Sequence, residues 1–289
     1  MKGIILAGGT GSRLWPMTRT VSKQLLPIYD KPMIYYPIST LMLAGIREIL
    51  IITTPQDQSQ FRDLLGDGSS IGVSFKYAKQ TEPKGLAQAL TIGEEFLAGS
   101  ACLMILGDNI FHGAGLGRDI NRVLPTNGAH IFTYNVQNPS EYGVLQVDEF
   151  NRALNLYEKP SLFVSNLAIT GLYYFDKLAP EYAHEIKPSK RGELEITELL
   201  SIYLNKSTLS HTPLSRGSVW LDTGKPNSLH DASTYVRVIE ERTGQKIACL
   251  EEVAFLNGWI DEKEVLQIAK SMKNSEYSAY LERIPNFGK

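Results

Sequence analysis

Short apolar segments of strand length alternate with amphipathic segments through the first 106 residues of this 289-residue chain. The apolar segments occupy residues 2–6, 48–53, 73–78 and 101–106. Amphipathic segments with the three- and four-residue spacing of a helix lie between them, at residues 33–44, 58–65 and 86–98. Strands that are apolar throughout and separated by helices are typical of a parallel sheet with both faces covered. The first half of the chain therefore predicts an α/β fold.

The pattern changes after about residue 129. Strands are predicted at residues 129–136, 168–175 and 219–221, and a hairpin at residues 142–147 and 153–158. Helical spacing returns at residues 227–242, and only helices, such as 262–272, are predicted beyond residue 250. We predict one α/β domain, residues 1–245, around a central mixed and mainly parallel sheet. Its halves are residues 1–128 and 129–245, and residues 246–289 form a small helical carboxyl-terminal part.

Composition narrows the class of protein. With 43% hydrophobic and 21% charged residues, the chain has the make-up of an ordinary globular protein. A formal charge of −2 argues against nucleic acid as a partner, so any anion site must be local. We expect a cytoplasmic protein with no membrane association, because no signal peptide and no spanning apolar segment is visible. Cys102 and Cys249 are too few for a disulfide framework or zinc site and are expected to be buried and reduced.

A glycine-rich segment, LAGGTGSRLWPMTR, runs from Leu6 to Arg19 directly after the first strand. It is not a dinucleotide fingerprint, because Leu14 stands where the third glycine is needed, and it is not a P-loop, because the first following lysine is Lys23. Glycines at a strand end can present backbone N–H groups to phosphate oxygens, and Arg13 adds a charged donor beside them. Taken alone, the glycines fit a tight turn with a surface arginine equally well.

Two aspartates follow apolar strands. Asp108 comes after the strand at 101–106, and Asp222 comes after Trp220 and Leu221. Carboxylates at the carboxyl ends of strands commonly serve the site of an α/β protein. Brought together, the two could hold Mg²⁺ through hard oxygen ligands, although either aspartate alone could equally cap a helix.

The pattern G-G-x-G-[ST]-R-L-x-P-x-T, followed by S-K-x-L-L-P, resembles the signature of the sugar-1-phosphate nucleotidylyltransferases. The resemblance runs nearly end to end, through the segments EPKGLAQAL, LGDNIFHG, EYGVLQVD, YEKP, AITGLYYFD, RGELEIT and WLDTG. It implies a Rossmann-like three-layer nucleotidyltransferase fold. It also implies Mg²⁺-dependent transfer, in which glucose 1-phosphate attacks the α-phosphorus of dTTP and pyrophosphate leaves. The product would be dTDP-glucose, the first intermediate of deoxysugar synthesis such as that of dTDP-rhamnose and lipopolysaccharide, and the assembly would be a homotetramer, a dimer of dimers.

The resemblance assigns roles to residues at matching positions. Arg13, Lys23, Asp108 and Asp222 are implied to be catalytic, and both aspartates to bind the metal. The nucleotide-binding set is Leu6, Gly8, Gly9, Thr10, Gly11, Ser12, Gln24, Gln80, Pro83, Gly85 and Leu86. The sugar-phosphate set is Asn109, Tyr142, Gly143, Glu158, Lys159, Thr170, Tyr173 and Arg191. Gln80 is expected to pair with the pyrimidine edge, and Gly85 to leave space for the base.

Two of these expectations depend on local geometry. Adjacent strand residues point to opposite faces, so Glu158 and Lys159 can serve one site only at a strand end or bulge. Lys159 directly precedes Pro160, where a strand normally stops. Arg191, considered alone, would more often be a surface residue in a polar loop.

One position departs from the family pattern. In the segment CLEEVAFLNGWI, Leu256 replaces an arginine that in relatives contributes to a regulatory site for the end-product nucleotide sugar. An uncharged side chain cannot donate to a diphosphate, so we expect weakened feedback inhibition with catalysis intact. His112 and Arg216 either serve that second site or lie at the surface.

Three alternatives stay open. A uridylyltransferase differs by one methyl group on the base, worth about 1–3 kcal/mol. An adenylyltransferase is disfavoured by the absence of a β-helical carboxyl-terminal domain in 289 residues. A non-catalytic nucleotide-sugar-binding protein predicts loss of the proposed catalytic residues, but all four are present.

Overall fold

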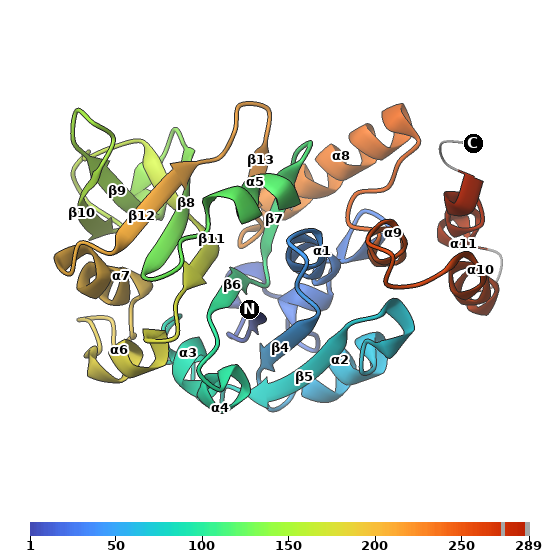
Figure 1. The fold of residues 1–289 in the computed structure, drawn as a ribbon, viewed down its shortest axis with the longest axis horizontal. Helices are drawn as coiled ribbons and strands as arrows, with labels where there is room; N and C mark the ends of the chain where they lie inside the picture. The colour runs from blue at the N-terminus through green and yellow to red at the C-terminus, as the bar shows by residue number, and fades with distance from the viewer. Residues whose placement is uncertain (273–274, 287–289) are drawn as a thin grey trace.

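The computed structural model describes residues 1–272 and 275–286 (Figure 1). Four parallel strands form one half of a nine-stranded sheet, in the order β5-β4-β1-β6. Their bounds are β1 Lys2–Ala7, β4 Glu48–Thr53, β5 Ser74–Lys79 and β6 Cys102–Leu106. The four parallel strands predicted from apolar segments are confirmed, and each lies within a residue or two of its expected position.

The second half of the sheet is mixed. β11 pairs antiparallel with β6 and with β8 and β9, while β12 runs parallel to β8 and β10 closes a hairpin with β9. Their bounds are β8 Ala129–Asn135, β9 Gly143–Val147, β10 Ala153–Glu158, β11 Leu167–Phe175 and β12 Leu209–Pro213. The hairpin and the mixed, mainly parallel central sheet are as predicted, whereas β12 was not anticipated. In Figure 1 this half lies on the left, beyond β6.

Helices cover both faces of the sheet, as the fully apolar strands require. Ile4 and Ile5 of β1 are both inaccessible to solvent, yet they belong to different core clusters. The Ile5 side packs with α1 (Tyr35–Leu43), α2 (Gln58–Leu65) and α5 (Leu116–Val123). The Ile4 side packs with α3 (Gln88–Ile92), α4 (Glu94–Leu97), α6 (Ala179–Glu185) and α7 (Ile196–Asn205).

The single helix expected over residues 86–98 is wrong. The segment forms two short helices, α3 and α4, which meet at Gly93. A β-carbon on Gly93 would stand 2.9 Å from the Ile4 side chain, so only glycine allows the segment to approach the sheet this closely.

The carboxyl-terminal region is helical, with bounds α8 Pro226–Thr243, α9 Leu250–Leu256, α10 Glu262–Ser271 and α11 Glu276–Leu281. Leu250, Val253 and Ala254 of α9 belong to the same core cluster as Ile38 and Leu41 of α1. Figure 1 shows α10 and α11 at the edge of the molecule opposite the β9–β10 hairpin. None of the described helices is both long enough and apolar enough to cross a membrane.

Two small antiparallel ladders complete the fold. β2 (Pro27–Ile28) pairs with β3 (Lys31–Pro32), and β7 (Asn109–His112) pairs with β13 (Val219–Asp222). Short 3₁₀ turns occur at Ser12–Leu14, Lys23–Leu25, Ser69–Ile71, Pro139–Glu141 and Ile284–Asn286. The β7–β13 ladder was missed from sequence, where residues 109–112 were assigned no element. It joins the turn after β6 to the segment carrying Asp222.

Candidate active site

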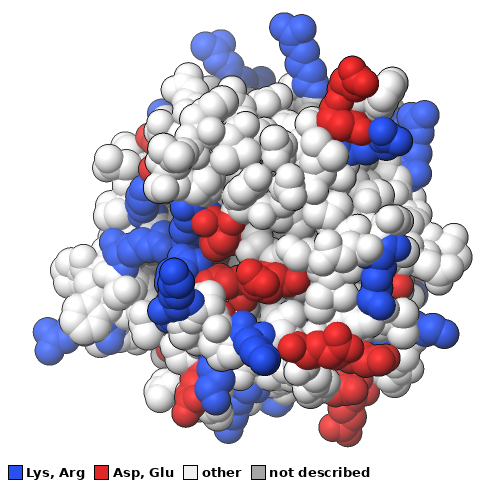
Figure 2. All heavy atoms as spheres, turned by 90° about the vertical axis from the view of Figure 1, so that its left-hand side faces the viewer, with Lys and Arg blue, Asp and Glu red and all other residues white. Residues whose placement is uncertain are grey.

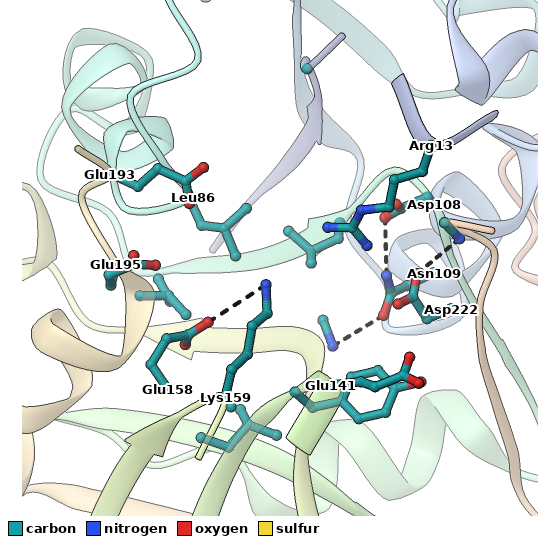
Figure 3. A pocket seen from close by; sticks show the side chains of 18 of the residues that line it. Arg13, Leu86, Asp108, Asn109, Glu141, Glu158, Lys159, Glu193, Glu195 and Asp222 are labelled. Atoms are coloured by element: carbon teal, nitrogen blue, oxygen red, sulfur yellow. Dashed lines mark hydrogen bonds and ion pairs between the residues drawn. The ribbon is translucent and has the colours of Figure 1, made fainter. Parts of the chain in front are cut away.

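A cleft of about 470 Å³ opens beside the carboxyl ends of β1 and β6 (Figure 3). Seventeen of the residues expected to bind substrate or metal line it. They are Gly9, Thr10, Gly11, Ser12, Arg13, Lys23, Pro83, Leu86, Asp108, Asn109, Tyr142, Gly143, Glu158, Lys159, Tyr173, Arg191 and Asp222. Segments from Gly9 near the start of the chain to Gly224 therefore meet in one space.

The glycine-rich loop leaves β1 and turns immediately into the cleft. A side chain at Gly8 would displace the Gln80 amide, because a β-carbon there would stand 2.4 Å from Oε1 of Gln80. Gly9 adopts a φ of +96°, which L-residues with a side chain rarely accept. The hydroxyl of Thr18 donates to the carbonyl of Gly11 at 2.8 Å and closes the loop. Backbone N–H groups and Arg13 are thereby presented to the cleft.

Lys23 and Asp108 form an ion pair in the cleft. Both side chains are largely shielded from solvent, and Asp108 also accepts a hydrogen bond of 3.1 Å from Nδ2 of Asn109. Burial alone would raise the pKa of Asp108, but the Lys23 charge and these hydrogen bonds hold it below its ordinary value. Asp108 is therefore ionised.

Asp222 has a different electrostatic environment. Its Oδ1 accepts a hydrogen bond of 3.1 Å from the backbone N–H of Gly224. Burial and the charge of Asp108 raise the pKa of Asp222 to about 6, against the opposing effect of Lys23 and Arg13. Burial and the charge of the ionised Asp108 thus disfavour ionisation of Asp222 in the metal-free cleft.

Two neighbouring carboxylates, one of which raises the pKa of the other, fit a divalent cation. The donors are hard carboxylate oxygens, which suit Mg²⁺ or a similar ion. No cluster of three or more histidine, cysteine, aspartate or glutamate ligands exists among the described residues. A cation held by Asp108 and Asp222 would therefore keep open positions for phosphate oxygens and water.

The opposite wall of the cleft carries a second charged network. Arg191 donates to Oε1 of Glu158 and Oε1 of Glu195, each at 2.9 Å, and Thr197 donates to Oε2 of Glu158 at 3.3 Å. Figure 3 shows Arg13, Asp108 and Asp222 on one side of the cleft and Glu158, Glu193 and Glu195 on the other. The face of the molecule that carries the β9–β10 hairpin, on the left in Figure 1, also mixes acidic and basic side chains (Figure 2).

Glu158 and Lys159 face the same cleft although they are neighbours in sequence. β10 ends at Glu158, and Lys159 takes a left-handed backbone conformation with a φ of +44°. The Lys159 ammonium lies 4.0 Å from Oε1 of Glu158. The expectation that a strand end would turn both side chains toward one site is confirmed.

Six residues assigned to substrate binding do not line the cleft, namely Leu6, Gly8, Gln24, Gln80, Gly85 and Thr170. The Thr170 hydroxyl is buried and donates to the carbonyl of Phe132 at 2.8 Å. The Gln80 amide is also buried and donates to Oε1 of Gln88 at 2.8 Å. Both polar groups already have partners inside the fold.

The space where a side chain of Gly85 would lie is filled by the backbone of Leu194. A β-carbon on Gly85, whose φ is +108°, would stand 2.4 Å from the carbonyl oxygen of Leu194. The backbone of Leu194 also donates to Lys84 at 2.6 Å and accepts from Ala87 at 3.2 Å. Gly85 is therefore required for backbone contact between the two halves of the domain.

Sequence reasoning missed several residues that line the cleft, chiefly Glu141, Glu193, Glu195, Thr197 and Trp220. Three of them lie within or beside the segment RGELEIT, and one in WLDTG. Both segments had been recognised as matching the family, so their acidic and aromatic members could have been included. Glu141 ends a short 3₁₀ turn and pairs with Lys225 at 2.5 Å.

Among described residues related to the expected regulatory site, Leu256 ends α9 with its side chain 72% exposed. His112 contacts the Tyr235 hydroxyl through Nδ1 at 2.6 Å, and Arg216 is exposed. Cys102 and Cys249 are buried and free, as expected.

The architecture and sequence match known nucleotidyltransferases. Residues 2–238 match the family model described as nucleotidyl transferase. A glucose-1-phosphate thymidylyltransferase of Neisseria meningitidis is 50% identical, with 98% of this chain and 99% of the relative aligned. One of Mycolicibacterium smegmatis is 52% identical, with 97% of this chain and 98% of the relative aligned.

Solved structures agree with this assignment. A Bacillus anthracis protein described as a glucose-1-phosphate thymidylyltransferase, in complex with sucrose, superposes with a TM-score of 0.76 and 38% identity. The match covers 82% of this chain and 95% of that one. A UDP-glucose pyrophosphorylase complexed with UDP-glucose, 24% identical, shares the fold with a TM-score of 0.74 over 82% of this chain and 98% of its own. The chain belongs to the nucleotidyl transferase family and, within it, to the group of the glucose-1-phosphate thymidylyltransferases.

Proposed function

We propose that this chain transfers a thymidylyl group from dTTP to glucose 1-phosphate, forming dTDP-glucose and releasing pyrophosphate. One observation carries the proposal: a single cleft joins the cationic glycine loop, a buried pair of aspartates and a charged network on the opposite wall. Relatives named for this reaction are about half identical over the full chain. Together, cleft and relatives support both the reaction class and the substrates.

The reaction requires two anions to approach each other. An oxygen of the sugar phosphate forms a bond to the α-phosphorus, and the bond from that phosphorus to the pyrophosphate oxygen breaks. No proton transfer and no covalent enzyme intermediate is needed, so catalysis depends on alignment and charge neutralisation. We assign Arg13 and Lys23 to the triphosphate, because both side chains project from the loop region into the cleft.

The opposite wall suits the sugar phosphate. Lys159 offers a positive charge, and Glu158 offers carboxylate oxygens that can accept from sugar hydroxyls. Glu158 is held by Arg191 and Thr197, so its orientation is set before substrate enters. This preorganisation reduces the entropy lost when sugar binds.

Members of this family generally use a divalent metal ion. We propose Mg²⁺ for this chain, held by Asp108 and Asp222, where it would neutralise phosphate charge and polarise the α-phosphate when bound. Lys23 would keep Asp108 ionised and ready to bind it.

The decisive experiment measures pyrophosphate release with glucose 1-phosphate and each of dTTP, UTP, ATP and CTP, with Mg²⁺ and with EDTA. We expect the highest kcat/KM with dTTP, measurable use of UTP, and no release in EDTA. The Asp108→Asn variant should lose activity with every triphosphate. Absence of release with all four nucleotides would overturn the proposed function, and a preference for UTP would overturn the choice of base.

We also propose a homotetrameric assembly, from the resemblance to the family, and a second nucleotide-sugar site weakened by Leu256. The uncharged Leu256 side chain supplies no donor to a diphosphate. We expect dTDP-rhamnose to inhibit the wild-type chain weakly and the Leu256→Arg variant more strongly. Strong inhibition of the wild type would contradict the weakening, and sedimentation velocity would test the tetramer.

A further inference from the structure

We propose that Trp220 and Asn109 are positioning residues for the reaction: the Trp220 indole fixes the Asn109 amide, and that amide orients the Asp108 carboxylate. The inference rests on the proposed function for its kinetic consequence. Its structural basis is a chain of three hydrogen-bonded side chains that line the cleft, of which Asn109 and Asp108 are labelled in Figure 3.

The Asn109 amide is buried, with 2% of its surface exposed, and its partners are all within the protein. Its Oδ1 accepts from Nε1 of Trp220 at 2.6 Å and from the backbone N–H of Gly171 at 3.2 Å. Its Nδ2 donates to Oδ1 of Asp108 at 3.1 Å. Lys23 pairs with the other carboxylate oxygen, so both oxygens of Asp108 are held.

These partners allow only one orientation of the amide. A rotation by half a turn would set Oδ1 against the Asp108 carboxylate and Nδ2 against two N–H donors. Each of the three contacts would then be repulsive in a site with little water to screen it. The N–H donors of Trp220 and Gly171 therefore hold the amide oxygen on their side, so the amide nitrogen of Asn109 faces Asp108.

The β7–β13 ladder explains why Trp220 can serve this purpose. Asn109 lies directly opposite Asp222 in the antiparallel register, and Trp220 lies two residues before Asp222. Residues two apart on a strand share a face, as do residues directly opposite. One short ladder thus places the indole, the amide and the second carboxylate on the same side.

Packing around the indole limits its movement. The Trp220 ring contacts Tyr142 with centroids 5.1 Å apart, and Tyr134 with centroids 6.0 Å apart. Trp220 is 7% exposed, and its N–H is donated to Asn109. Gly171 gives the amide its room, because a β-carbon there would stand 2.5 Å from Oδ1 of Asn109.

The kinetic test compares Trp220→Phe, Asn109→Ala and the double variant in pyrophosphate release at saturating glucose 1-phosphate. We expect each single variant to lower kcat by about tenfold or more, with KM for dTTP changed less than about twofold. In the Asn109→Ala background, Trp220→Phe should lower kcat no further, because it acts through Asn109. Trp259→Phe, in a tryptophan remote from the cleft, is the matched control and should retain the wild-type kcat.

Asn109→Asp separates positioning from a merely structural role. It keeps the acceptor oxygen for Trp220 and Gly171 but replaces the Nδ2 donor with a second carboxylate oxygen against Asp108. We expect kcat to fall at least as far as in Asn109→Ala. A near-wild-type kcat in Asn109→Asp, or multiplicative losses in the double variant, would overturn the proposal.

A measurement without substrate keeps the inference independent of the reaction. The chain has three tryptophans, whose indole N–H signals can be resolved by ¹⁵N NMR and assigned with the Trp→Phe variants. We expect the Trp220 N–H to exchange most slowly with solvent in the wild type and at least about tenfold faster in Asn109→Ala. Fast exchange in the wild type would overturn the positioning role, whereas a wild-type enzyme without pyrophosphate release would overturn only the proposed function.

Discussion

Asp222 shares the cleft with Asp108, and burial together with the charge of that neighbour raises the pKa of Asp222 from 3.8 to about 6. A carboxylate whose pKa is higher in the folded than in the unfolded state destabilises the fold once it ionises. The destabilisation grows as the pH rises from about 4 to about 6 and is complete above that range. Ionised Asp222 therefore lowers the free energy of unfolding of the metal-free protein at neutral pH.

Asp222→Asn should raise the Tm of the metal-free protein at pH 7.5 and leave it unchanged near pH 4. The amide keeps an acceptor for the Gly224 N–H but removes the unfavourable charge. Thermal unfolding in EDTA, monitored by circular dichroism at both pH values, measures the effect. We expect pyrophosphate release to fall on the order of 100-fold in the same variant. A lower Tm at pH 7.5 would show that Asp222 stabilises the fold.

Glu158→Gln should weaken binding of glucose 1-phosphate much more than binding of dTTP. The change removes the carboxylate charge that attracts Arg191, and it alters the group that accepts a hydrogen bond from Thr197. We expect KM for glucose 1-phosphate to rise by about tenfold, with KM for dTTP within twofold, in initial-rate assays that vary each substrate. Glu94→Gln, which breaks a surface pair with His184, is the control and should change neither constant. Equal increases in both constants would argue against a sugar-specific role.

Gly85→Ala should destabilise the protein more than Gly45→Ala. Both glycines have positive φ, but Gly45 faces open space, whereas a methyl group on Gly85 would collide with the Leu194 backbone. We expect a loss of about 1 kcal/mol for Gly45→Ala from backbone strain alone. The loss for Gly85→Ala should reach about 3 kcal/mol or more, because the neighbouring backbone must also move. Urea unfolding compares the two variants, and similar midpoints would contradict the close contact.

His130 should make the protein less stable in acid. Its side chain is 2% exposed, and burial, with a smaller effect of His211, lowers its pKa to about 4. The unfolded state binds a proton near pH 6.5 and the folded state only near pH 4, so the free energy of unfolding falls as the pH drops between these values. The full loss amounts to about 3 kcal/mol.

Urea unfolding between pH 4 and 7 tests this, with His130→Gln expected to flatten the pH dependence. His184→Gln is the control, because His184 lies at the surface and pairs with Glu94. Identical pH profiles for the wild type and His130→Gln would refute the assignment.

Much of the fold follows from the sequence because parallel strands buried on both faces must be apolar throughout. β1, β4 and β6 satisfy that condition and were located correctly. The β7–β13 ladder does not: NIFH and VWLD are four residues long and mix polar with apolar side chains. Their pairing depends on contacts across 110 residues, which no local pattern encodes.

The residues of the candidate site are likewise only partly predictable from local sequence. Asp108 and Asp222 could be anticipated because each follows a strand, and Lys159 because a proline ends its strand. Glu195 is different. It lies in a polar segment with the spacing of a surface loop, and only the tertiary fold brings it to Arg191 at the cleft wall. Gly85 presents a related difficulty, since a glycine indicates that space is needed without indicating what fills it, and here the Leu194 backbone lies where a β-carbon would be.

The contact between Gly85 and Leu194 joins two segments of the cleft lining that are far apart in the sequence. Backbone hydrogen bonds from Leu194 to Lys84 and from Ala87 to Leu194 leave no side chain between the segments to absorb a displacement. Pro83 and Leu86 line the cleft from the first segment, and Arg191, Glu193 and Glu195 from the second. The segment that carries these charged side chains is therefore fixed to the segment of Pro83 and Leu86 by main-chain contacts, so a displacement of either segment is transmitted directly to the other.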